Sequence, residues 1–273
     1  MIKADLHLHS NYSDGKYSPE ELIIKAKEAG LSVVSITDHD SLGALKEAIE
    51  AGEKNDVKVI PGIEFSANLE EREVHIIAYF IDYENESFLN YVSYLREMRF
   101  NRLNEMIKQL NRLGCNIKLE SVTDGYPDNI AFGRPHLAAA LFREGFVKSY
   151  REAFQKFIGD NKPANVKKTN PPAEDIIKLI TKYGGLSFVA HPGKYFSESF
   201  ISELIELGID GIEVIHPSHS KEDVKYFSDI ASEHFLLQSG GSDFHGIDGN
   251  DFNNLGNYYV SGNEIENMKR RLF

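Results

Sequence analysis

Cysteine is almost absent from the chain, which contains one, Cys115, among 273 residues. A single cysteine excludes an internal disulfide framework. No uninterrupted apolar run reaches the length that a membrane-spanning helix needs. Met1 is followed by Ile-Lys-Ala-Asp and not by the basic start and apolar core of a secretion signal. We therefore expect a cytoplasmic protein that does not bind a membrane.

Basic residues are outnumbered, with 30 lysines and arginines against 42 aspartates and glutamates and a formal net charge of −12. A large nucleic-acid footprint needs clustered Lys and Arg, so the charge argues against a long duplex as a partner. A groove for a few nucleotides needs no basic surface overall. Carboxylates gathered around bound cations would also count in this sum.

Repeats and low-complexity tracts are missing too, and 41% hydrophobic with 26% charged residues is the composition of a globular protein.

The first part of the chain alternates between strand-like and helix-like segments. In SPEELIIKAKEAG, Ser18 can cap a helix, Pro19 suits its first position, Glu21 completes a capping box and Gly30 ends the helix. Such alternation is typical of α/β folds with parallel strands.

The alternation stops near residue 85 and returns after the proline-containing segment NKPANVKKTNPP. Between them lie long amphipathic helical patterns. We predict that residues 1–84 and 171–273 form one α/β domain and that residues 85–170 form a helical insertion contributing to substrate binding. About seven strands, near residues 2, 32, 57, 73, 186, 211 and 236, fit an α/β barrel with an inserted cap. An open doubly wound sheet is the alternative.

Two histidines end the first predicted strand. In the segment ADLHLHS, strand alternation sends His7 and His9 to one face and Leu6 and Leu8 to the other. Two imidazoles on one face can share a metal ion. An isolated His-x-His is as often a pair of structural, hydrogen-bonded histidines, so the motif indicates a metal site only if other ligands occur elsewhere in the chain.

Most other histidines and several acidic residues also end or follow predicted strands, and His75 lies within one. In α/β folds, functional groups collect at the carboxyl ends of parallel strands. Imidazole and carboxylate ligands suit zinc, manganese or iron, and the lack of thiolates argues against a structural zinc knuckle. The residues concerned are Asp38, His39, Asp40, Glu64, His75, His191, His216, His219, Asp243 and His245.

The motifs DLHLHSNYSDG, TDHD, GIEFS, AHPG and GGSDFHG, with the isolated His75 among them, span residues 5–246. In order and spacing they resemble the motifs of the polymerase and histidinol phosphatase (PHP) superfamily of metal-dependent phosphoesterases. The resemblance implies a distorted (β/α)7 barrel with two or three divalent metal ions, which could be Mn²⁺, Zn²⁺, Fe²⁺ or Mg²⁺. It also implies hydrolysis of a phosphomonoester by a metal-activated hydroxide.

The resemblance divides the metal ligands among three ions. The first ion is assigned His7, His9, Glu64 and Asp243. The second shares Glu64 as a bridge and adds His75 and His191. The third is assigned Asp14, His39 and His245. Asp14 stands where many histidinol-phosphate phosphatases of the family have histidine, and an oxygen ligand favours harder ions such as Mn²⁺ or Mg²⁺.

The insertion carries the indication of the substrate. The segment AFGRPHLA places Arg134 and His136 at a helix start, where arginine can bind phosphate and the helix amino end favours an anion. The alternative is a capped helix with a surface arginine. GRPH in a helical insertion resembles the family branch that removes the 3′-phosphate of nucleoside 3′,5′-bisphosphates and trims short single-stranded oligonucleotides. This resemblance implies that Arg134 and His136 bind substrate phosphate.

Further groups near the strand ends are candidates for proton transfer or substrate contact. His216 and His219 could donate a proton to the leaving oxygen, bind phosphate or be structural. Asp40 could donate a proton or orient a ligand imidazole, and we favour the orienting role. Lys194 is expected to contact the substrate, with plain surface exposure as the alternative.

Three other functions remain open. Histidinol-phosphate phosphatase shares the chemistry, but Asp14 and the GRPH insertion weigh against it. Amidohydrolase barrels also open with His-x-His, yet they usually bridge their metals with a modified lysine where this chain has Glu64. A non-catalytic, metal-stabilised binding module ranks lower, because the chain retains all the expected ligands.

Overall fold

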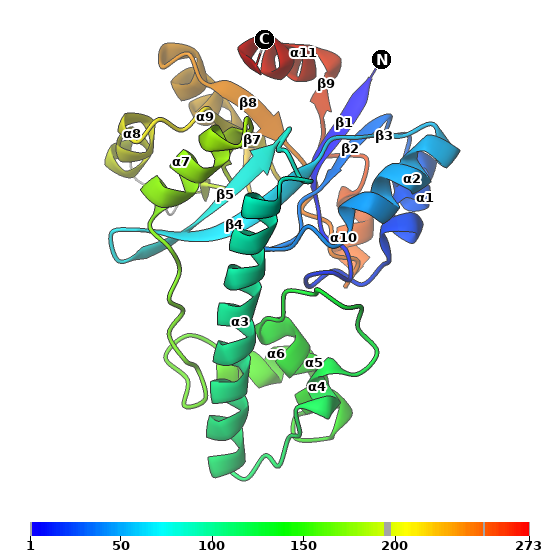
Figure 1. Cartoon of the computed structure of the whole chain (residues 1–273), viewed down its shortest axis with the longest axis vertical. Coiled ribbons are helices and arrows are strands. Elements are labelled where there is room, and N and C mark those ends of the chain that lie inside the picture. The colour runs from blue at the N-terminus through cyan, green and yellow to red at the C-terminus, as the bar shows by residue number, and fades with distance from the viewer. Residues whose placement is uncertain (1, 194–197, 248, 273) are drawn as a thin grey trace.

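The computed structural model describes residues 2–193, 198–247 and 249–272 (Figure 1). Lys194, which the sequence predicted to contact the substrate, lies outside the described residues. An upper body contains the β-sheets, and a lower body is helical. The long helix α3 (Glu86–Arg112) runs from the upper body into the lower one.

The first sheet has four strands in the order β3-β2-β1-β9. They are β1 (Lys3–Leu8), β2 (Val33–Ile36), β3 (Lys58–Val59) and β9 (Val260–Ser261). The first three run parallel, and β9 is antiparallel to β1. The crossovers are α1 (Pro19–Glu28) and α2 (Leu45–Asn55). Almost every residue of β1 and β2 is buried, as in parallel strands covered on both faces.

Helix α1 starts as the sequence predicts. Ser18 Oγ accepts the backbone N–H of Glu21, the carboxylate of Glu21 accepts the backbone N–H of Ser18, and Pro19 occupies the first turn. Gly30, just beyond the helix, has a φ of 79°, a conformation that glycine adopts without strain. The predicted capping box and helix end are confirmed.

The second sheet has five strands in the order β4-β5-β6-β7-β8. They are β4 (Gly62–Leu69), β5 (Arg72–Tyr79), β6 (Leu186–Val189), β7 (Gly211–Ile215) and β8 (Leu237–Gly240). Strands β4 and β5 form an antiparallel hairpin, β6 is antiparallel to β5, and β6, β7 and β8 are parallel. The hairpin turns at Glu70, whose φ is 52°.

The described residues form a mixed α/β fold that only partly matches the expected (β/α)7 barrel. Two isolated bridges connect the sheets, Leu8 with Phe244 and His39 with Glu64. No continuous ladder closes a barrel among the described residues, because the strands divide into two separate sheets. The tight turn between β4 and β5 also forces antiparallel pairing where a βα unit would give parallel strands. Both bridges lie at strand ends that carry predicted site residues.

In the part of the chain that is described, the upper body has five further helices, which alternate with the later strands or follow them. Helix α7 packs on β4, β5 and β6 through Ile176, Ile177 and Ile180. The helices are α7 (Ala173–Lys182), α8 (Glu198–Glu206), α9 (Lys221–Glu233), α10 (Gly249–Asn254) and α11 (Gly262–Leu272).

The helical insertion has a hydrophobic core of its own, in which Leu110 of α3 packs with Leu137 and Leu141. Its other elements are α4 (Glu120–Thr123), α5 (Arg134–Arg143), α6 (Tyr150–Ala153) and the π-helix η1 (Phe154–Ile158). The first half of α3 instead packs in the core of the second sheet, through Phe88 and Leu95. The boundary between the two cores therefore lies within α3.

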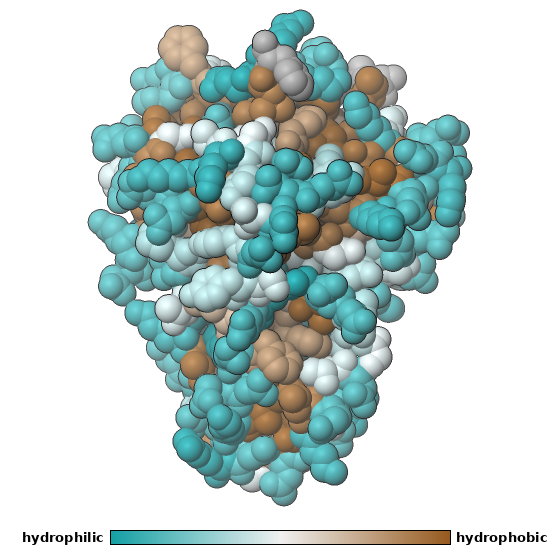
Figure 2. Space-filling model, viewed as in Figure 1, coloured by the Kyte–Doolittle hydropathy of each residue, from teal (hydrophilic) through white to brown (hydrophobic). Residues whose placement is uncertain are grey.

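Polar side chains cover most of the face shown in Figure 2, with apolar atoms exposed in smaller areas between them. Among the helices of the described ranges, none combines the length and the hydropathy that crossing a membrane requires.

Candidate metal centre

His7 and His9 lie at the end of β1 and point to the same side. Their Nε2 atoms are 3.1 Å apart, and both residues are buried. Two imidazole nitrogens at this separation can face one cation. Strand alternation, which sends i and i+2 to one face, accounts for the arrangement.

Glu64 of β4 lies at the centre of the histidines. Its Oε1 is 2.9 Å from Nδ1 of His75 and 3.1 Å from Nε2 of His191. Its Oε2 is 2.9 Å from Nδ1 of His39 and 3.4 Å from Nε2 of His9. The two oxygens of one carboxylate thus face different histidines, as a ligand shared between two ions requires.

Two aspartates complete the cluster. Asp243, just after β8, lies with Oδ1 3.3 Å from Nε2 of His7 and 3.1 Å from Nε2 of His9. Asp14 lies with Oδ1 3.2 Å from Nε2 of His245. Both aspartate side chains are partly exposed, whereas those of His7 and His9 are fully buried. The cluster is therefore buried on one side and accessible on the other.

The nine side chains predicted to bind metal fall into four overlapping groups whose ligand atoms lie within 4.8 Å of one another. The groups are His7, His9 and Asp243; His7, Glu64 and His191; His39, Glu64 and His75; and His9, Asp14, His39 and His245. This grouping differs from the division that the resemblance implied. His39 faces Glu64 as well as Asp14, and His9 faces Asp14 as well as Asp243.

Three buried atoms of the cluster, Asp14 Oδ1, His39 Nδ1 and Glu64 Oε2, make no hydrogen bond of ordinary geometry among the described residues. Their close contacts are ion pairs within the cluster, His39 Nδ1 with Glu64 Oε2 at 2.9 Å and Asp14 Oδ1 with Nε2 of His245 at 3.2 Å. A divalent cation would satisfy such atoms, and imidazole with carboxylate is a donor set for zinc, manganese or iron. The residues present therefore fit divalent metal ions.

The carboxylates of the cluster are ionised at neutral pH. Burial alone would raise the pKa of Glu64, but His39 and His75 hold it well below its ordinary value. The pKa values of Asp14 and Asp243 are likewise held low, against the effect of burial, by their histidine neighbours. Ionised carboxylates are the form that binds cations.

The imidazoles divide into two sets. Burial lowers the pKa of His9 and that of His39, so both are neutral at pH 7. Burial would also lower the pKa of His75, but Glu64 outweighs it and raises that pKa to about 9. A cation beside His75 would take the place of this proton.

A buried glutamate that the sequence did not single out supports the histidines from behind. Glu213 of β7 lies with Oε1 2.9 Å from Nδ1 of His7, and its Oε2 accepts the backbone N–H of His191 at 2.6 Å. A proton on Nδ1 of His7 leaves Nε2 free to face the cluster. Glu213 lies in the apolar-looking segment IEVIH, where strand alternation could have indicated that it points inward.

Two further buried aspartates hold the loops that carry side chains of the cluster. Asp38 accepts hydrogen bonds from the backbone N–H of Ser10 at 2.8 Å and from Oγ of Ser13 at 2.6 Å. These bonds fix the loop between His9 and Asp14. Asp5 accepts the backbone N–H groups of His7 and Ser242, which joins β1 to the segment after β8.

Backbone strain is concentrated at the site. Asp40, His191 and Asp243 have φ values of 45°, 29° and 50°, in the left-handed region that residues with a side chain rarely adopt. Each follows a strand of the upper body. Such conformations cost about 1–3 kcal/mol each and tend to occur at functional sites.

Asp40 does not contact the ring of His39 in any described hydrogen bond or ion pair. Its Oδ2 accepts a hydrogen bond from Nε of Arg99 at 2.5 Å, and its Oδ1 accepts the backbone N–H of Ser66 at 3.1 Å. The structure therefore pairs Asp40 with an arginine of α3, where the sequence led us to favour the orientation of an imidazole.

His216 and His219 differ in their surroundings. Nδ1 of His219 donates to the carbonyl of Val214 at 2.9 Å, and its Nε2 accepts the backbone N–H of Gly193 at 3.1 Å. Both ring nitrogens are thus used by the backbone, as in a structural histidine. Nε2 of His216 lies 3.3 Å from Oδ2 of Asp243, at the edge of the cluster.

Arg134 and His136 both lie in the first turn of α5 but contact different groups. Nη1 of Arg134 donates to Oδ1 of Asp160 at 2.6 Å, and Arg134 lines a cavity with Asp14 of the cluster. His136 is buried, its Nδ1 accepts the backbone N–H of Gly133 at 3.0 Å, and the backbone of Ser13 is its second partner. His136 therefore caps α5 and fixes the Ser13 loop, and it does not line that cavity.

Three cationic side chains missed by the sequence analysis line the same cavity: Arg99 and Arg102 of α3, and Lys168. The cavity measures about 180 Å³. Arg99 and Arg102 are three residues apart, so they share a helix face. Sequence alone did not show which face of α3 turns toward the cluster, because that depends on how the helix packs.

Comparison with known proteins agrees with this geometry. The family described as PHP domain matches residues 5–187. The chain is 33% identical over 250 residues to the 3′,5′-nucleoside bisphosphate phosphatase of Chromobacterium violaceum, covering 90% of this chain and 88% of that protein. It is 29% identical over 245 residues to the phosphoribosyl 1,2-cyclic phosphate 1,2-diphosphodiesterase of Eggerthella lenta, covering 89% and 94%. It is 31% identical over 251 residues to a 5′-3′ exoribonuclease of Haemophilus influenzae, covering 89% and 90%.

A solved structure has the same overall arrangement. The protein, from Bifidobacterium adolescentis, is described as a metal-dependent phosphoesterase. It aligns with 98% of this chain and 96% of its own length, with a TM-score of 0.87 at 29% identity. On the family match, these relatives and the His/Asp/Glu cluster, the chain belongs to the PHP domain family and is a metal-dependent hydrolase.

Proposed function

We propose that the protein hydrolyses phosphomonoesters, and that its main substrate is a nucleoside 3′,5′-bisphosphate from which it removes the 3′-phosphate. One observation carries the proposal. The 180 Å³ cavity is lined by cluster side chains and by four cationic side chains together. The cluster contributes Asp14, His39 and His75, and the cationic side chains are Arg99, Arg102, Arg134 and Lys168.

The nine residues of the cluster would hold two or three divalent ions, and Glu64 would be among the ligands. When bound, such ions supply a nucleophile of lowered pKa at neutral pH and neutralise charge on phosphoryl oxygens. Asp38 and Glu213 hold the ligand-bearing loops and the ring of His7 in place. The ligand shell thus needs little rearrangement to receive a substrate.

The cationic side chains would hold the phosphates. Arg134 pairs with Asp160, whose side chain is 82% exposed, so a substrate phosphate can replace that partner at little cost. Arg102 donates to the carbonyl of Val166 and to the side-chain oxygen of Asn165, and no described carboxylate forms an ion pair with it. Arg99 and Lys168 are paired with Asp40 and Glu73, so Arg102 and Arg134 are the two cations most available to phosphate. Two such cations beside the cluster suit a substrate with two phosphates better than one with a single phosphate.

We assign the transfer of a proton to the leaving oxygen to His216. Its Nε2 faces Asp243 at the edge of the cluster, whereas both ring nitrogens of His219 are occupied by the backbone. Asp40 is neutralised by Arg99 and is a weaker candidate. His216→Asn should therefore lower kcat without changing KM much.

The named relatives support a nucleotide substrate. One is a nucleoside bisphosphate phosphatase and another an exoribonuclease, and both match along most of this chain. Short single-stranded oligonucleotides are accordingly our second substrate class.

Phosphate release by the Mn²⁺-loaded protein tests the proposal. Adenosine 3′,5′-bisphosphate, 3′-AMP, 5′-AMP, histidinol phosphate and p-nitrophenyl phosphate should be compared side by side, with His191→Ala as the control. We expect the highest kcat/KM for the bisphosphate and loss of activity in the control. A bisphosphate rate no higher than that for p-nitrophenyl phosphate would overturn the nucleotide assignment, and a preference for histidinol phosphate would replace it.

A further inference from the structure

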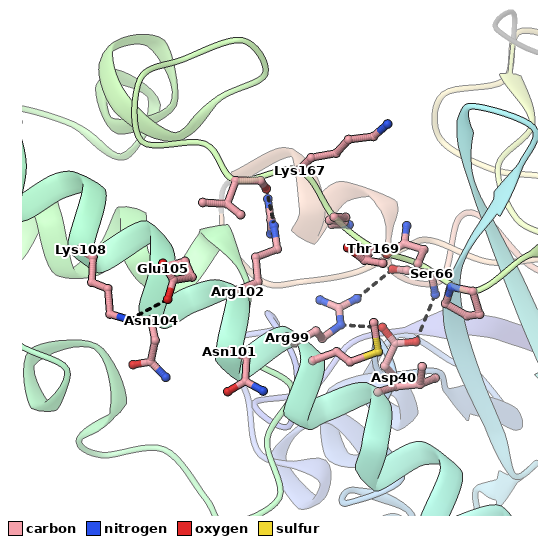
Figure 3. Close-up of a pocket in the computed structure, with 16 residues that line it drawn as sticks. Asp40, Ser66, Arg99, Asn101, Arg102, Asn104, Glu105, Lys108, Lys167 and Thr169 are labelled. Carbon is pink, nitrogen blue, oxygen red and sulfur yellow. Dashed lines mark hydrogen bonds and ion pairs between the residues drawn. The ribbon is translucent and has the colours of Figure 1, made fainter.

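A second, larger cavity adjoins the first (Figure 3). It measures about 620 Å³ and lies between α3 and the segment 166–171. Arg99, Arg102 and Lys168 line this cavity and the cluster cavity alike, so they form a common wall. A ligand bound at the cluster would therefore have the larger cavity directly beside it, on the other side of these three side chains.

The larger cavity is electropositive although the chain is acidic. Five cationic side chains line it against two acidic ones, and Glu71 and Glu73 beside it pair with Lys167 and Lys168, which leaves an excess of one positive charge on a chain with a formal charge of −12. The cationic residues are Arg99, Arg102, Lys108, Lys167 and Lys168, and the acidic ones are Asp40 and Glu105. An excess of this sign favours an anionic ligand.

The charges are spread along the cavity. Arg99 and Lys108 are nine residues apart on α3, which is about 13 Å along a helix. Figure 3 shows Arg99 beside Asp40 and Ser66, and Lys108 farther along α3. A single phosphate cannot reach both ends, so the lining suits an extended anion.

The cations farther from the cluster are only weakly neutralised. Lys108 pairs with Glu105, and Lys167 pairs with Glu71, but in both pairs each side chain is at least half exposed. Exposed ion pairs contribute little and yield readily to a phosphate. Asn101, Asn104 and Asn170 add hydrogen-bonding groups to the lining.

We propose that this cavity binds a further nucleotide unit of a short single-stranded oligonucleotide whose first unit occupies the cluster cavity. The proposal rests on the proposed function and extends it to the substrate's length. None of the described lining residues is aromatic, so the bases have no aromatic ring to stack on in this cavity and the cationic side chains contact the phosphates.

The test compares a long and a short substrate on one variant. Lys108→Ala with Lys167→Ala removes two charges that line the larger cavity and not the cluster cavity. The matched control is Lys225→Ala with Lys269→Ala, which removes two lysines that also pair with exposed carboxylates, on α9 and α11. KM and kcat of the Mn²⁺-loaded enzymes are measured for adenosine 3′,5′-bisphosphate and for a 3′-fluorescein, 5′-phosphorylated pentanucleotide.

We expect the KM for the pentanucleotide to rise at least about threefold in the cavity variant, the loss from two exposed charge contacts. The slope of log KM against the logarithm of the salt concentration should decrease by about 0.7 for each lost phosphate contact. Kinetics with the bisphosphate should not change, and the control should behave as wild type. An unchanged pentanucleotide KM, or an equal rise for both substrates, would overturn the subsite.

Failure of the proposed function gives a different result. If the wild-type enzyme cleaves neither substrate, the uncleaved labelled pentanucleotide reports binding by fluorescence anisotropy on the same protein. The cavity variant must then bind it at least about threefold more weakly than the control for the subsite to stand. Equal binding by the two variants would reject the subsite.

Discussion

Glu213 and His7 are joined at 2.9 Å between a carboxylate oxygen and Nδ1, and the second oxygen of Glu213 accepts the backbone N–H of His191. Two donors from β1 and from the end of β6 thus converge on one fully buried carboxylate of β7. An amide in its place has one acceptor oxygen for the two donors. Its NH₂ group would face either the N–H of His191 or Nδ1 of His7.

Glu213→Gln should therefore weaken metal binding although the side chain keeps its size. We expect a loss of about 10- to 100-fold in metal affinity, the usual effect of removing such a supporting partner. Isothermal titration with Mn²⁺ measures it directly. The control is Asp210→Asn, because Asp210 also accepts two hydrogen bonds from β6, through Ser187, but lies at the opposite end of β7. Equal affinities of wild type and Glu213→Gln would show that Glu213 is structural only.

Gly241 marks a close approach between the segment after β8 and β1. A Cβ atom at Gly241 would lie 2.5 Å from the backbone nitrogen of His7 and 2.6 Å from Oδ1 of Asp5. Gly241→Ala should therefore separate the two segments and lower the free energy of unfolding by about 1–3 kcal/mol, the range for overpacking. Chemical denaturation measures this change. Gly249→Ala, where a Cβ would meet nothing within 4 Å, is the control and should be near neutral.

Arg102 lies between the two cavities without a carboxylate partner among the described residues. Arg102→Met keeps the length of the side chain and removes the charge. We expect kcat/KM for adenosine 3′,5′-bisphosphate to fall about 10- to 100-fold, the value of a hydrogen bond to a charged group, with most of the effect in KM. Arg112→Met, an exposed change on the same helix, should leave it unaltered. Equal losses in both variants would remove Arg102 from the substrate site.

His136 makes the insertion sensitive to acid. Burial lowers its pKa, so the folded protein takes up the proton less readily than the unfolded chain. As the pH falls below about 6.5, the unfolded state gains a proton that the folded state does not, and the free energy of unfolding decreases. His136→Gln removes this contribution. The stability advantage of wild type over the variant should be largest near pH 7.5 and shrink toward pH 5, as measured by urea denaturation. A constant difference would contradict the lowered pKa.

The side chains of the cluster could be predicted from the sequence because they belong to ordered motifs in or after strands. His7 and His9 lie on one side of their strand, and each of the other seven belongs to a motif or stands alone in a strand. The capping box at Ser18 and the extent of α3 could also be predicted from the sequence, because both depend on local spacing.

The remaining features depend on tertiary packing. The hairpin of β4 and β5 turns at Glu70 and Glu71 without glycine or proline, so no local signal separated it from a βα unit. The direction in which Arg99 points follows from the packing of α3 on the second sheet. His136 could equally have faced a phosphate or capped its own helix, and the hydrogen bond from Gly133 decides for the cap.

The most direct test of the metal centre is the metal content of the protein after reconstitution with Mn²⁺ and gel filtration, measured by mass spectrometry. Wild type should retain two or three equivalents. Glu64→Gln should retain at most one equivalent. The two carboxylate oxygens of Glu64 face different histidines, and the amide keeps only one oxygen that can bind an ion. A wild-type protein that retains no Mn²⁺, or a Glu64→Gln variant that retains the full complement, would contradict a metal centre built around Glu64.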